Sequence, residues 1–337
     1  MITFELIENI AALRALADRW KRLWFADVET TPFQSPEWLI PWAECFCDRN
    51  SSGALFSVVA HDQGEMVALF PLYIYASPTD KVRQLLLLGA GTSDYLGGVF
   101  SSYCCRELLS EFTDFIFRWK SRWDIMHLGP LRPLSRLIGL QRSSEATITP
   151  CSEIPILDYR IPSKMKKNLA YYQRRAEALG ELRLHVLPAE EVLDGFASMT
   201  ELHAQRWKKK GQPGVFSDTR VVNHHRRTLP VLCRSHLARL YKLAAEDHVL
   251  AMAYVLMDPR EESKRAYYYI TGLNGAFRHV SPGSLLLKYL LDALREEGVL
   301  TLDLLRGTEN YKKLWGAKAV PAYSFSVRST TFAQVAA

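Results

Sequence analysis

The sequence lacks the features that would indicate a metalloprotein or a disulfide-stabilised protein. Among its 337 residues there is no CxxC pair and no pair of histidines at metal-ligand spacing. The pattern predicts neither a zinc site nor a disulfide framework, and we expect no metal. We interpret the six cysteines as reduced, mostly buried thiols; they are Cys45, Cys47, Cys104, Cys105, Cys151 and Cys233.

Long apolar runs are missing as well. No stretch approaches the roughly 20 apolar residues that a membrane-spanning helix needs. The first residues, MITFELIENI, carry acidic side chains where a secretory signal peptide would carry basic ones. The sequence thus predicts a cytoplasmic protein without a membrane span.

Two common nucleotide-binding fingerprints are also absent. The chain contains neither the Gly-Lys-Ser/Thr of a Walker motif nor a G-x-G-x-x-G sequence, so kinase and NAD-dependent functions are poorly supported. The charge excess is small, with 42 Lys and Arg against 36 Asp and Glu. Much of it lies in 164–175 and 206–210, which favour a phosphate-bearing cofactor, an acidic surface or RNA, or are ordinary solvated helix faces.

The elements that are present alternate as in a two-domain α/β protein. The chain exceeds the usual length of one domain, and 15 Tyr, 15 Phe and 8 Trp supply apolar area for two cores. In the first half, β-branched and aromatic residues on both sides of a HDQGE turn predict a hairpin. The expected strands there cover 2–6, 54–60, 66–75, 83–89 and 123–129, and the expected helices cover 9–24, a segment beginning at Ser35-Pro36, and 107–119.

The second half repeats this order of hairpin, strand, helix and strand. We therefore predict an α/β fold of two similar halves, 1–150 and 151–337, each a mixed, twisted sheet flanked by helices. A segment rich in turn formers over 140–162 is the expected junction. The expected strands of the second half cover 182–187, 238–246, 250–258, 265–272 and 300–307, and its expected helices cover 163–179, 190–209, 218–235 and 282–297.

The sharpest local signal for chemistry is a strand that leads through a Gly/Ser loop into a helix. The segments RAYYYITG, LNGAFRHVSPGS and LLLKYLLDAL place backbone N–H groups and a helix dipole where an anion binds. Arg278 supplies a mobile cation and Ser281 an N-cap hydroxyl. Pro282 suits the first helical turn, and Gly283 lets the backbone approach a ligand closely. The segment is either a phosphate cradle or an ordinary helix cap.

A second signal lies where the strand over 300–307 ends and turns into a short helix. Open α/β sheets commonly build ligand sites at this carboxyl edge. Tyr311 is suited to donate a proton to a leaving thiolate, and Lys312 or Arg306 to neutralise phosphate or substrate charge. Alternatively, Tyr311 and Trp315 are simply the packed face of the helix, because they lie four residues apart.

Two further residues have equally good structural interpretations. His203, four residues before Trp207, is either a general base or a structural histidine on a half-apolar helix. In the first half, Asp94 follows a buried strand within a glycine-rich loop. A carboxylate there would repel phosphate, so we interpret Asp94 as a contact to a substrate amine or as a loop cap.

Six segments together carry a family resemblance. The most specific are SPGSLLL (281–287) and LDLLRGTENYKKLWGA (302–317). The others are TPFQSPEWLIPW (31–42), GTSDYL (91–96), SKMKKNLAYYQRR (163–175) and LHAQRWKKKGQPGVF (202–216). Over nearly its whole length the chain resembles GNAT-superfamily acetyltransferases associated with cellulose biosynthesis (CelD/BcsL-like), relatives of the tandem-GNAT Fem-type aminoacyl transferases.

The resemblance implies an acyl-CoA site in the second half. GNAT enzymes bind the cofactor pyrophosphate with a loop written [RQ]-x-x-G-x-[GA], which 278–283 matches except that Ser281 replaces the first glycine. The thioester then lies beside strand 267–271, an amine attacks it directly, and Tyr311 takes the place of the tyrosine acid. The implied cofactor-binding residues are Tyr269, Ile270, Thr271, Arg278, His279, Val280, Ser281, Pro282, Gly283 and Ser284.

The expected activity is transfer of an acyl group from acetyl-CoA or another acyl-CoA to the amine of a small molecule or sugar. Asp303 and His203 are the candidate bases, and the candidate substrate contacts are Asp94, Trp207, Arg306 and Lys312. Two alternatives stay open: a Fem-like transferase using charged tRNA, with the basic helix on the RNA, and a non-catalytic partner in envelope polysaccharide synthesis. The acceptor and the oligomeric state are open.

Overall fold

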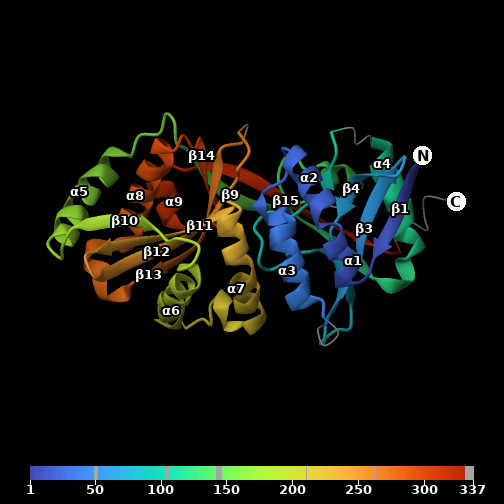
Figure 1. Cartoon of the computed structure of the whole chain (residues 1–337), viewed down its shortest axis with the longest axis horizontal. Helices are drawn as coiled ribbons and strands as arrows, with labels where there is room; N and C mark the ends of the chain where they lie inside the picture. Colours follow the sequence, from blue (N-terminus) through green and yellow to red (C-terminus); the bar gives the residue numbers. More distant parts are fainter. Residues whose placement is uncertain (49–51, 103–105, 142–145, 210, 262, 331–337) are drawn as a thin grey trace. The chain divides into compact units, whose positions relative to one another are not determined.

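The fold is a mixed α/β arrangement of two compact units (Figure 1). The computed structural model describes residues 1–48, 52–102, 106–141, 146–209, 211–261 and 263–330. Unit 1 comprises Met1–Thr149 with Pro321–Ala337, and unit 2 comprises Pro150–Val320. The predicted fold class is confirmed. Among the described residues, no helix combines the length and the apolar character needed to span a membrane.

Unit 1 starts with a strand and three helices, and side chains cap the first and third helices at their N-termini. The Asn9 side chain accepts the Ala12 N–H at 2.8 Å, and Ser35 accepts the Trp38 N–H at 3.3 Å, as predicted for Ser35. The helices are α1 (Ile10–Ala15), α2 (Ala17–Ala26), α3 (Pro36–Phe46) and α4 (Arg106–Arg118). The strands are β1 (Ile2–Ile7), β2 (Gly53–Leu55), β3 (Ser57–Asp62), β4 (Glu65–Phe70), β5 (Leu72–Ala76), β6 (Arg83–Leu87), β7 (Val99–Phe100) and β8 (Ile125–Leu131).

The predicted hairpin over 54–75 is corrected in one respect, because each of its strands is broken. The inner part, β3 with β4, pairs in the order β1-β3-β4-β7, whereas β2 and β5 pair with each other and β5 pairs with β6. Pro71 separates β4 from β5 and has no N–H to donate to a strand ladder. On the facing strand the Ser57 hydroxyl accepts the Leu72 N–H at 3.1 Å, so the break is satisfied by a side chain.

Unit 2 contains the elements expected for the second half. Its helices are α5 (Ser163–Glu177), α6 (Val192–Lys209), α7 (Thr219–Arg234), α8 (Pro282–Glu296) and α9 (Asn310–Leu314). Its strands are β10 (Leu182–Val186), β11 (Ala238–Ala245), β12 (His248–Met257), β13 (Arg265–Leu273), β14 (Thr301–Arg306) and most of β9 (Thr147–Pro155). They pair in the order β10-β11-β12-β13-β14-β9, and only β13 with β14 is parallel among these described pairs.

Helices cover both faces of this sheet (Figure 1). On β12, Ala251, Ala253 and Val255 belong to the core shared with α5 and α8. The intervening Met252 lies toward α6, as its proximity to Gly195 shows. This alternation is the two-residue period of a strand buried on both faces, and it explains why the sequence of β12 is apolar throughout.

The C-terminal segment departs from the sequence-based division at residue 150. The last strand, β15 (Lys318–Arg328), pairs with β8 through Tyr323–Arg328, so residues from Pro321 onward belong to unit 1. A single cut in the chain does not reproduce this arrangement, since the chain leaves unit 1 and returns to it.

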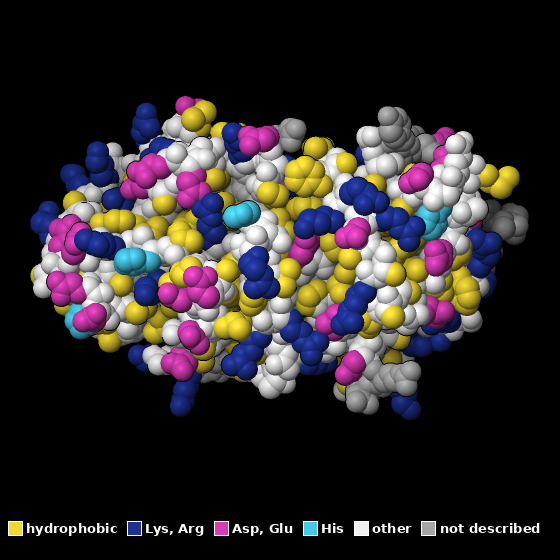
Figure 2. All heavy atoms as spheres, viewed as in Figure 1, with side chains coloured by type: hydrophobic (Ala, Val, Ile, Leu, Met, Phe, Trp, Pro, Cys, Tyr) yellow, Lys and Arg dark blue, Asp and Glu magenta, His cyan; other side chains and the backbone are white. Residues whose placement is uncertain are grey.

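Acidic and basic side chains alternate over the visible face, and Lys and Arg side chains also project over α5 (Figure 2).

Candidate functional site

The parallel strands at the centre of unit 2 separate soon after they meet. β13 and β14 pair only at Arg265↔Thr301, Ala266↔Leu302 and Tyr267↔Asp303, although both strands continue further. The register between β12 and β13 shifts between Tyr254 and Val255, which leaves Tyr269 as an additional residue in β13. The bulge and the parting of the two strands open a gap in the sheet at its carboxyl edge, where α/β proteins build ligand sites.

A cleft of about 590 Å³ lies at this gap. Its walls come from the end of α6, the second half of β13, the start of α8, and α9. Of the predicted cofactor residues, Thr271, Arg278, Ser281, Pro282, Gly283 and Ser284 line the cleft, whereas Tyr269, Ile270, His279 and Val280 do not. The predicted acid Tyr311 lines it as well.

The start of α8 presents backbone to the cleft. Ser281 holds a left-handed conformation (φ 49°, ψ 62°), and its hydroxyl donates to the Ser284 hydroxyl at 3.0 Å instead of capping a backbone N–H. Pro282 has no N–H, so Gly283 carries the first N–H of the helix, for which the described part of the chain supplies no acceptor. A β-carbon on Gly283 would meet the Leu273 side chain at 3.2 Å. This turn is shaped to hold an anion against backbone.

Positive charge surrounds that turn. Arg206, Lys209 and Arg278 all line the cleft, and none of the Asp and Glu residues that the structure describes does. The Lys209 ammonium lies beside Gly275, 3.1 Å from where a β-carbon would stand. Sequence reasoning placed Arg278 here and recognised the basic cluster over 206–210, but it did not assign Arg206 and Lys209 to this site, although they are three residues apart on a helix and so share a face. The cleft is therefore suited to a polyanionic ligand.

Two tyrosines, Tyr268 and Tyr311, form one wall of the cleft, which we call the tyrosine wall. Tyr268 and Tyr311 both line the cleft, and burial raises the pKa of each phenol well above its usual value. The negative charge of Glu309 raises the pKa of Tyr311 further, while Arg206 lowers both pKa values and so lies within electrostatic reach of both rings. Both phenols remain protonated at neutral pH and are available as hydrogen-bond donors.

The side chains of Asp303 and Lys312 form hydrogen bonds to the backbone at the end of β14. Leu305 has a positive φ of 60°, unusual for a non-glycine residue, where β14 bulges against β9. Asp303 Oδ1 accepts the Leu305 N–H at 2.8 Å. The buried Lys312 ammonium donates to the carbonyls of Leu305, Arg306 and Gly307 at 3.0, 2.8 and 3.3 Å. We call this arrangement the Leu305 brace.

The Leu305 brace leaves little room for the roles predicted from sequence. Asp303 also faces Arg265 at 3.4 Å, as expected for a paired structural carboxylate. Lys312 is 3% exposed and does not line the cleft, nor does the exposed Arg306. Lys312, the residue after Tyr311, instead holds the end of β14, from which the chain leads into the helix that carries Tyr311. The sequence could not show this role.

The buried His203 and the half-buried Trp207 form a pair next to Gln205 and Arg206 on α6, but neither lines the cleft. The Trp207 indole donates to His203 Nε2 at 2.8 Å, which occupies the lone pair that a base would use. Burial, with a contribution from Arg206, lowers the pKa of His203 to about 4. The imidazole is therefore neutral and hydrogen-bonded, which fits the structural interpretation better than the catalytic one.

The corresponding place in unit 1 is filled by its own chain. β6 and β8 are also parallel and also pair over only three residues, from Gln84↔Ile125 to Leu86↔His127. After β6 the loop over 88–98 turns back, and the Leu96 N–H donates to the Pro130 carbonyl at 2.9 Å. The cavity beside this loop has a volume of about 10 Å³, enough for about one water molecule.

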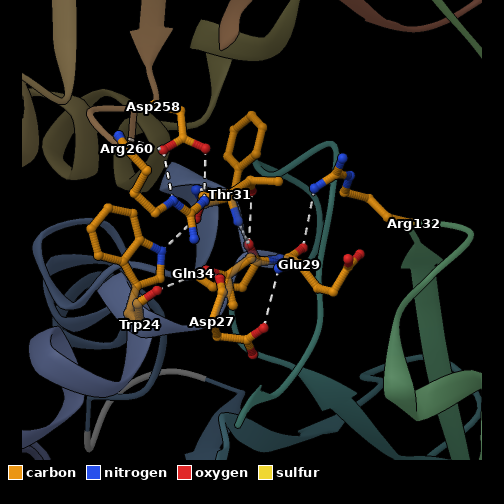
Figure 3. Close-up of polar contacts among 10 residues, drawn as sticks. Trp24, Asp27, Glu29, Thr31, Gln34, Arg132, Asp258 and Arg260 are labelled. Atoms are coloured by element: carbon orange, nitrogen blue, oxygen red, sulfur yellow. Dashed lines mark hydrogen bonds and ion pairs between the residues drawn. The ribbon is translucent and has the colours of Figure 1, made fainter. Parts of the chain in front are cut away.

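Side chains from the helical segment of unit 1 fasten this loop. The Trp38 indole donates to Ser93 Oγ at 2.9 Å, and Gln34 donates to the Tyr95 carbonyl at 3.1 Å. Gln34 is itself held, because its Oε1 accepts the Thr31 N–H at 2.7 Å (Figure 3). Asp94 is buried within this loop, is not among the residues that line the cleft, and has partners of its own.

Metal chemistry receives no support from the described residues. No group of three or more His, Cys, Asp or Glu side chains in the described ranges is arranged to hold a metal ion. Of the histidines in unit 2, His224 and His225 are buried on α7 among aromatic rings.

These features define a GNAT-type fold, and the comparisons agree. Residues 163–313 match the family model described as "Acetyltransferase (GNAT) domain". A comparison with curated proteins found no match.

Among solved structures, FemX is similar at 10% identity and a TM-score of 0.63, covering 95% of this chain and 98% of FemX. The C-terminal domain of a putative lysylphosphatidylglycerol synthetase from Agrobacterium fabrum is similar at 11% identity and a TM-score of 0.58, covering 97% and 95%. L-PGS from Bacillus licheniformis gives 11% identity and a TM-score of 0.58, covering 97% and 94%. At these identities the likeness concerns the fold.

Proposed function

We propose that this protein is an N-acyltransferase that moves an acyl group from acyl-CoA to an amine in the cleft of unit 2. The observation that carries the proposal is the coincidence of an opened parallel strand pair, an unpaired helix N-terminus at Gly283 and two cleft-lining cations, Lys209 and Arg278, without acidic partners in the described residues. A diphosphate fits such a place because N–H groups, a helix dipole and mobile cations all favour it.

Each part of the cleft has a role in this proposal. The Gly283 N–H, Arg278 and Lys209 bind the phosphates, and backbone N–H groups of β13 beyond its last partner on β14 orient the acyl carbonyl. Acyl-CoA supplies an activated thioester, whose carbonyl carbon is attacked by the free amine. Tyr311 donates a proton to the departing thiolate, and the proton lost from the nitrogen passes to solvent in the open cleft.

Solvent takes the last role because neither predicted base is well placed. Asp303 is engaged by the Leu305 brace and by Arg265, and His203 accepts the Trp207 N–H. A cleft in which Arg206 and Lys209 are exposed admits water, and an uncharged fraction of the amine is present at neutral to alkaline pH. The proposal therefore predicts rates that rise with pH until the amine itself has lost its proton.

Calorimetric titration with acetyl-CoA and longer acyl-CoAs tests the proposal. We expect binding to the wild type and loss of binding in the double variant Arg278→Ala/Gly283→Trp, because the indole would occupy the cleft. Lys208→Ala is the matched control, since Lys208 lies on α6 but does not line the cleft. Absence of binding to any acyl-CoA, or equal binding by the double variant, would contradict the proposal.

A second candidate function is favoured by α5. Lys164, Lys166, Lys167, Arg174 and Arg175 are all exposed on this one helix, which has the single acidic residue Glu177. Such a face suits a nucleic-acid backbone, and the fold is similar to that of FemX. A charged tRNA would then be the acyl donor. Salt-dependent tRNA binding that fails when Lys166 and Lys167 become Glu, with no acyl-CoA binding, would favour this candidate. Failure of both donors to bind would favour the non-catalytic role.

A further inference from the structure

Arg206 is a cation at the reacting end of the cleft that the binding of phosphates does not require. It lies on α6 and lines the cleft together with Tyr268 and Tyr311, and its charge lowers the pKa of both phenols. Lys209 lies one helical turn further on, about 4.5 Å along the axis, next to Gly275. The two cations thus lie at different parts of the cleft. Lys209 lies with Arg278 near the turn before α8, and Arg206 lies near the two phenols.

Several other arginines differ from Arg206 because each is paired with a carboxylate. Arg83, Arg239 and Arg265 each lie within 4 Å of a carboxylate, at Asp124, Glu297 and Glu153. Within the described part of the chain, Arg206 has no such carboxylate and no side-chain hydrogen-bond acceptor. An arginine that faces a cleft without an acidic partner leaves its five N–H donors for a ligand, and a guanidinium matches a planar carboxylate or a phosphate best.

The cleft also lacks the group that a simple amine would need. A site that holds a cationic substrate ordinarily provides a carboxylate near the ammonium. None of the described Asp or Glu residues lines this cleft, and Glu309, whose charge acts on Tyr311, is paired with Lys312 at 3.0 Å. Three cations would instead repel an acceptor whose only charge is its ammonium. An acceptor with an anionic group beside its amine would meet attraction where the plain amine meets repulsion.

We propose that the acceptor is an amine that also carries a carboxylate or phosphate group, and that Arg206 binds this anionic group beside Tyr268 and Tyr311. This inference rests on the proposed acyl transfer and adds the class of acceptor. Gln205, which also lines the cleft next to Arg206, supplies an amide donor for the same group. The amine nitrogen is then held close to the phenols, where the thioester is attacked.

Paired acceptors test the inference. Release of CoA thiol from acetyl-CoA is measured with alanine against alaninamide, and with glucosamine 6-phosphate against glucosamine, so that the members of each pair differ in the anionic group. The variants are Arg206→Gln and Arg206→Lys, with Lys208→Gln as the control that removes a cation from the same helix outside the cleft. Calorimetry with acetyl-CoA on every variant reports donor binding separately.

We expect the wild type to prefer the anionic member of at least one pair by about tenfold or more in kcat/KM. Arg206→Gln should remove this preference by raising the KM of the anionic acceptor, with acetyl-CoA binding unchanged. Arg206→Lys should restore part of the preference, because the charge returns without the planar fork. Lys208→Gln should behave like the wild type.

Several results would overturn the inference while leaving the proposed function intact. The first is binding of acetyl-CoA with equal transfer rates for the two members of each pair. The second is binding of acetyl-CoA with no transfer to either anionic member. The third is a loss of transfer rate in Arg206→Gln that is the same for neutral and anionic amines. The last result would assign Arg206 to the acyl group or the oxyanion. Weaker acetyl-CoA binding in Arg206→Gln would assign it to the donor. Failure of the wild type to bind acetyl-CoA would instead remove the proposed function itself.

Discussion

Each of the two units contains a pair of parallel strands that part after three residues, and they differ in what fills the gap. In unit 1 the loop after β6 returns to the gap, and its Leu96 N–H bonds to Pro130 of β8. In unit 2 the chain after β13 passes through a short turn directly into α8, and a cleft of about 590 Å³ is left. The gap between the parallel strands is thus filled by the protein's own loop in unit 1 and left open as a cleft in unit 2.

The difference teaches which half is suited to bind a ligand. The loop of unit 1 satisfies its polar groups with Trp38, Gln34 and its own backbone, so an anion would have to displace intact hydrogen bonds. The cleft of unit 2 has cations and a helix N–H that need a partner. The sequence-based prediction that the cofactor lies in the second half is consistent with this contrast, and binding experiments decide it.

The largest expected difference between the units is their response to acid. Burial lowers the pKa of His203 to about 4 and of His225 to about 3, both in unit 2. The unfolded chain takes up protons near pH 6.5, so the stability from these neutral rings is complete above that pH and is lost as pH falls toward 4. Urea unfolding at pH 7.5 and pH 5, followed by hydrogen exchange in each unit, checks this. Equal destabilisation of both units would contradict it, as would no gain in acid resistance for His225→Phe.

The Leu305 brace predicts the next largest effect. Replacement Lys312→Met removes the buried ammonium and leaves the carbonyls of Leu305, Arg306 and Gly307 without that donor. We expect about 3 kcal/mol of destabilisation, because unsatisfied buried groups are costly. Lys313→Met, at an exposed neighbouring position, is the control. Denaturant unfolding of the two variants measures the difference, and equal stabilities would show that the brace is unimportant.

The tyrosine wall predicts an effect on rate and not on stability. In Tyr311→Phe the ring remains but the proton donor is lost, so kcat should fall by about a hundredfold while acetyl-CoA affinity stays within about twofold. Because burial raises the pKa of the phenol well above its usual value, the wild-type rate should not decline as pH rises from 7 to 10. An unchanged kcat in Tyr311→Phe would exclude it as the acid. The result would leave Tyr268 as the remaining phenol.

The smallest effect is expected in unit 1. Ser93→Ala removes the acceptor of the Trp38 indole and should cost about 1 kcal/mol. Acetyl-CoA binding should be unaffected, because the loop is proposed to fill its own gap. Calorimetry and thermal unfolding on this variant test both statements. Stronger or weaker acyl-CoA binding would mean that unit 1 also takes part in holding the donor.

The sequence predicted the order of elements well because strands such as β12 and helices such as α8 have clear periodicity and caps. It did not predict the break at Pro71, where a proline and a serine hydroxyl decide between one long strand and two. It also did not predict the positive φ of Leu305, which depends on Asp303 and Lys312 meeting across a bulge. Arg206 was within a recognised basic cluster, but only the parting of β13 and β14 gives it a cleft to face.

Hydrogen exchange with and without acetyl-CoA tests the central claim most directly, because it reports on both gaps in one experiment. The account predicts that the ligand slows exchange over 268–287 in unit 2 and leaves 86–98 in unit 1 unchanged. Protection confined to unit 1, or no protection in either unit at saturating acetyl-CoA, would contradict it.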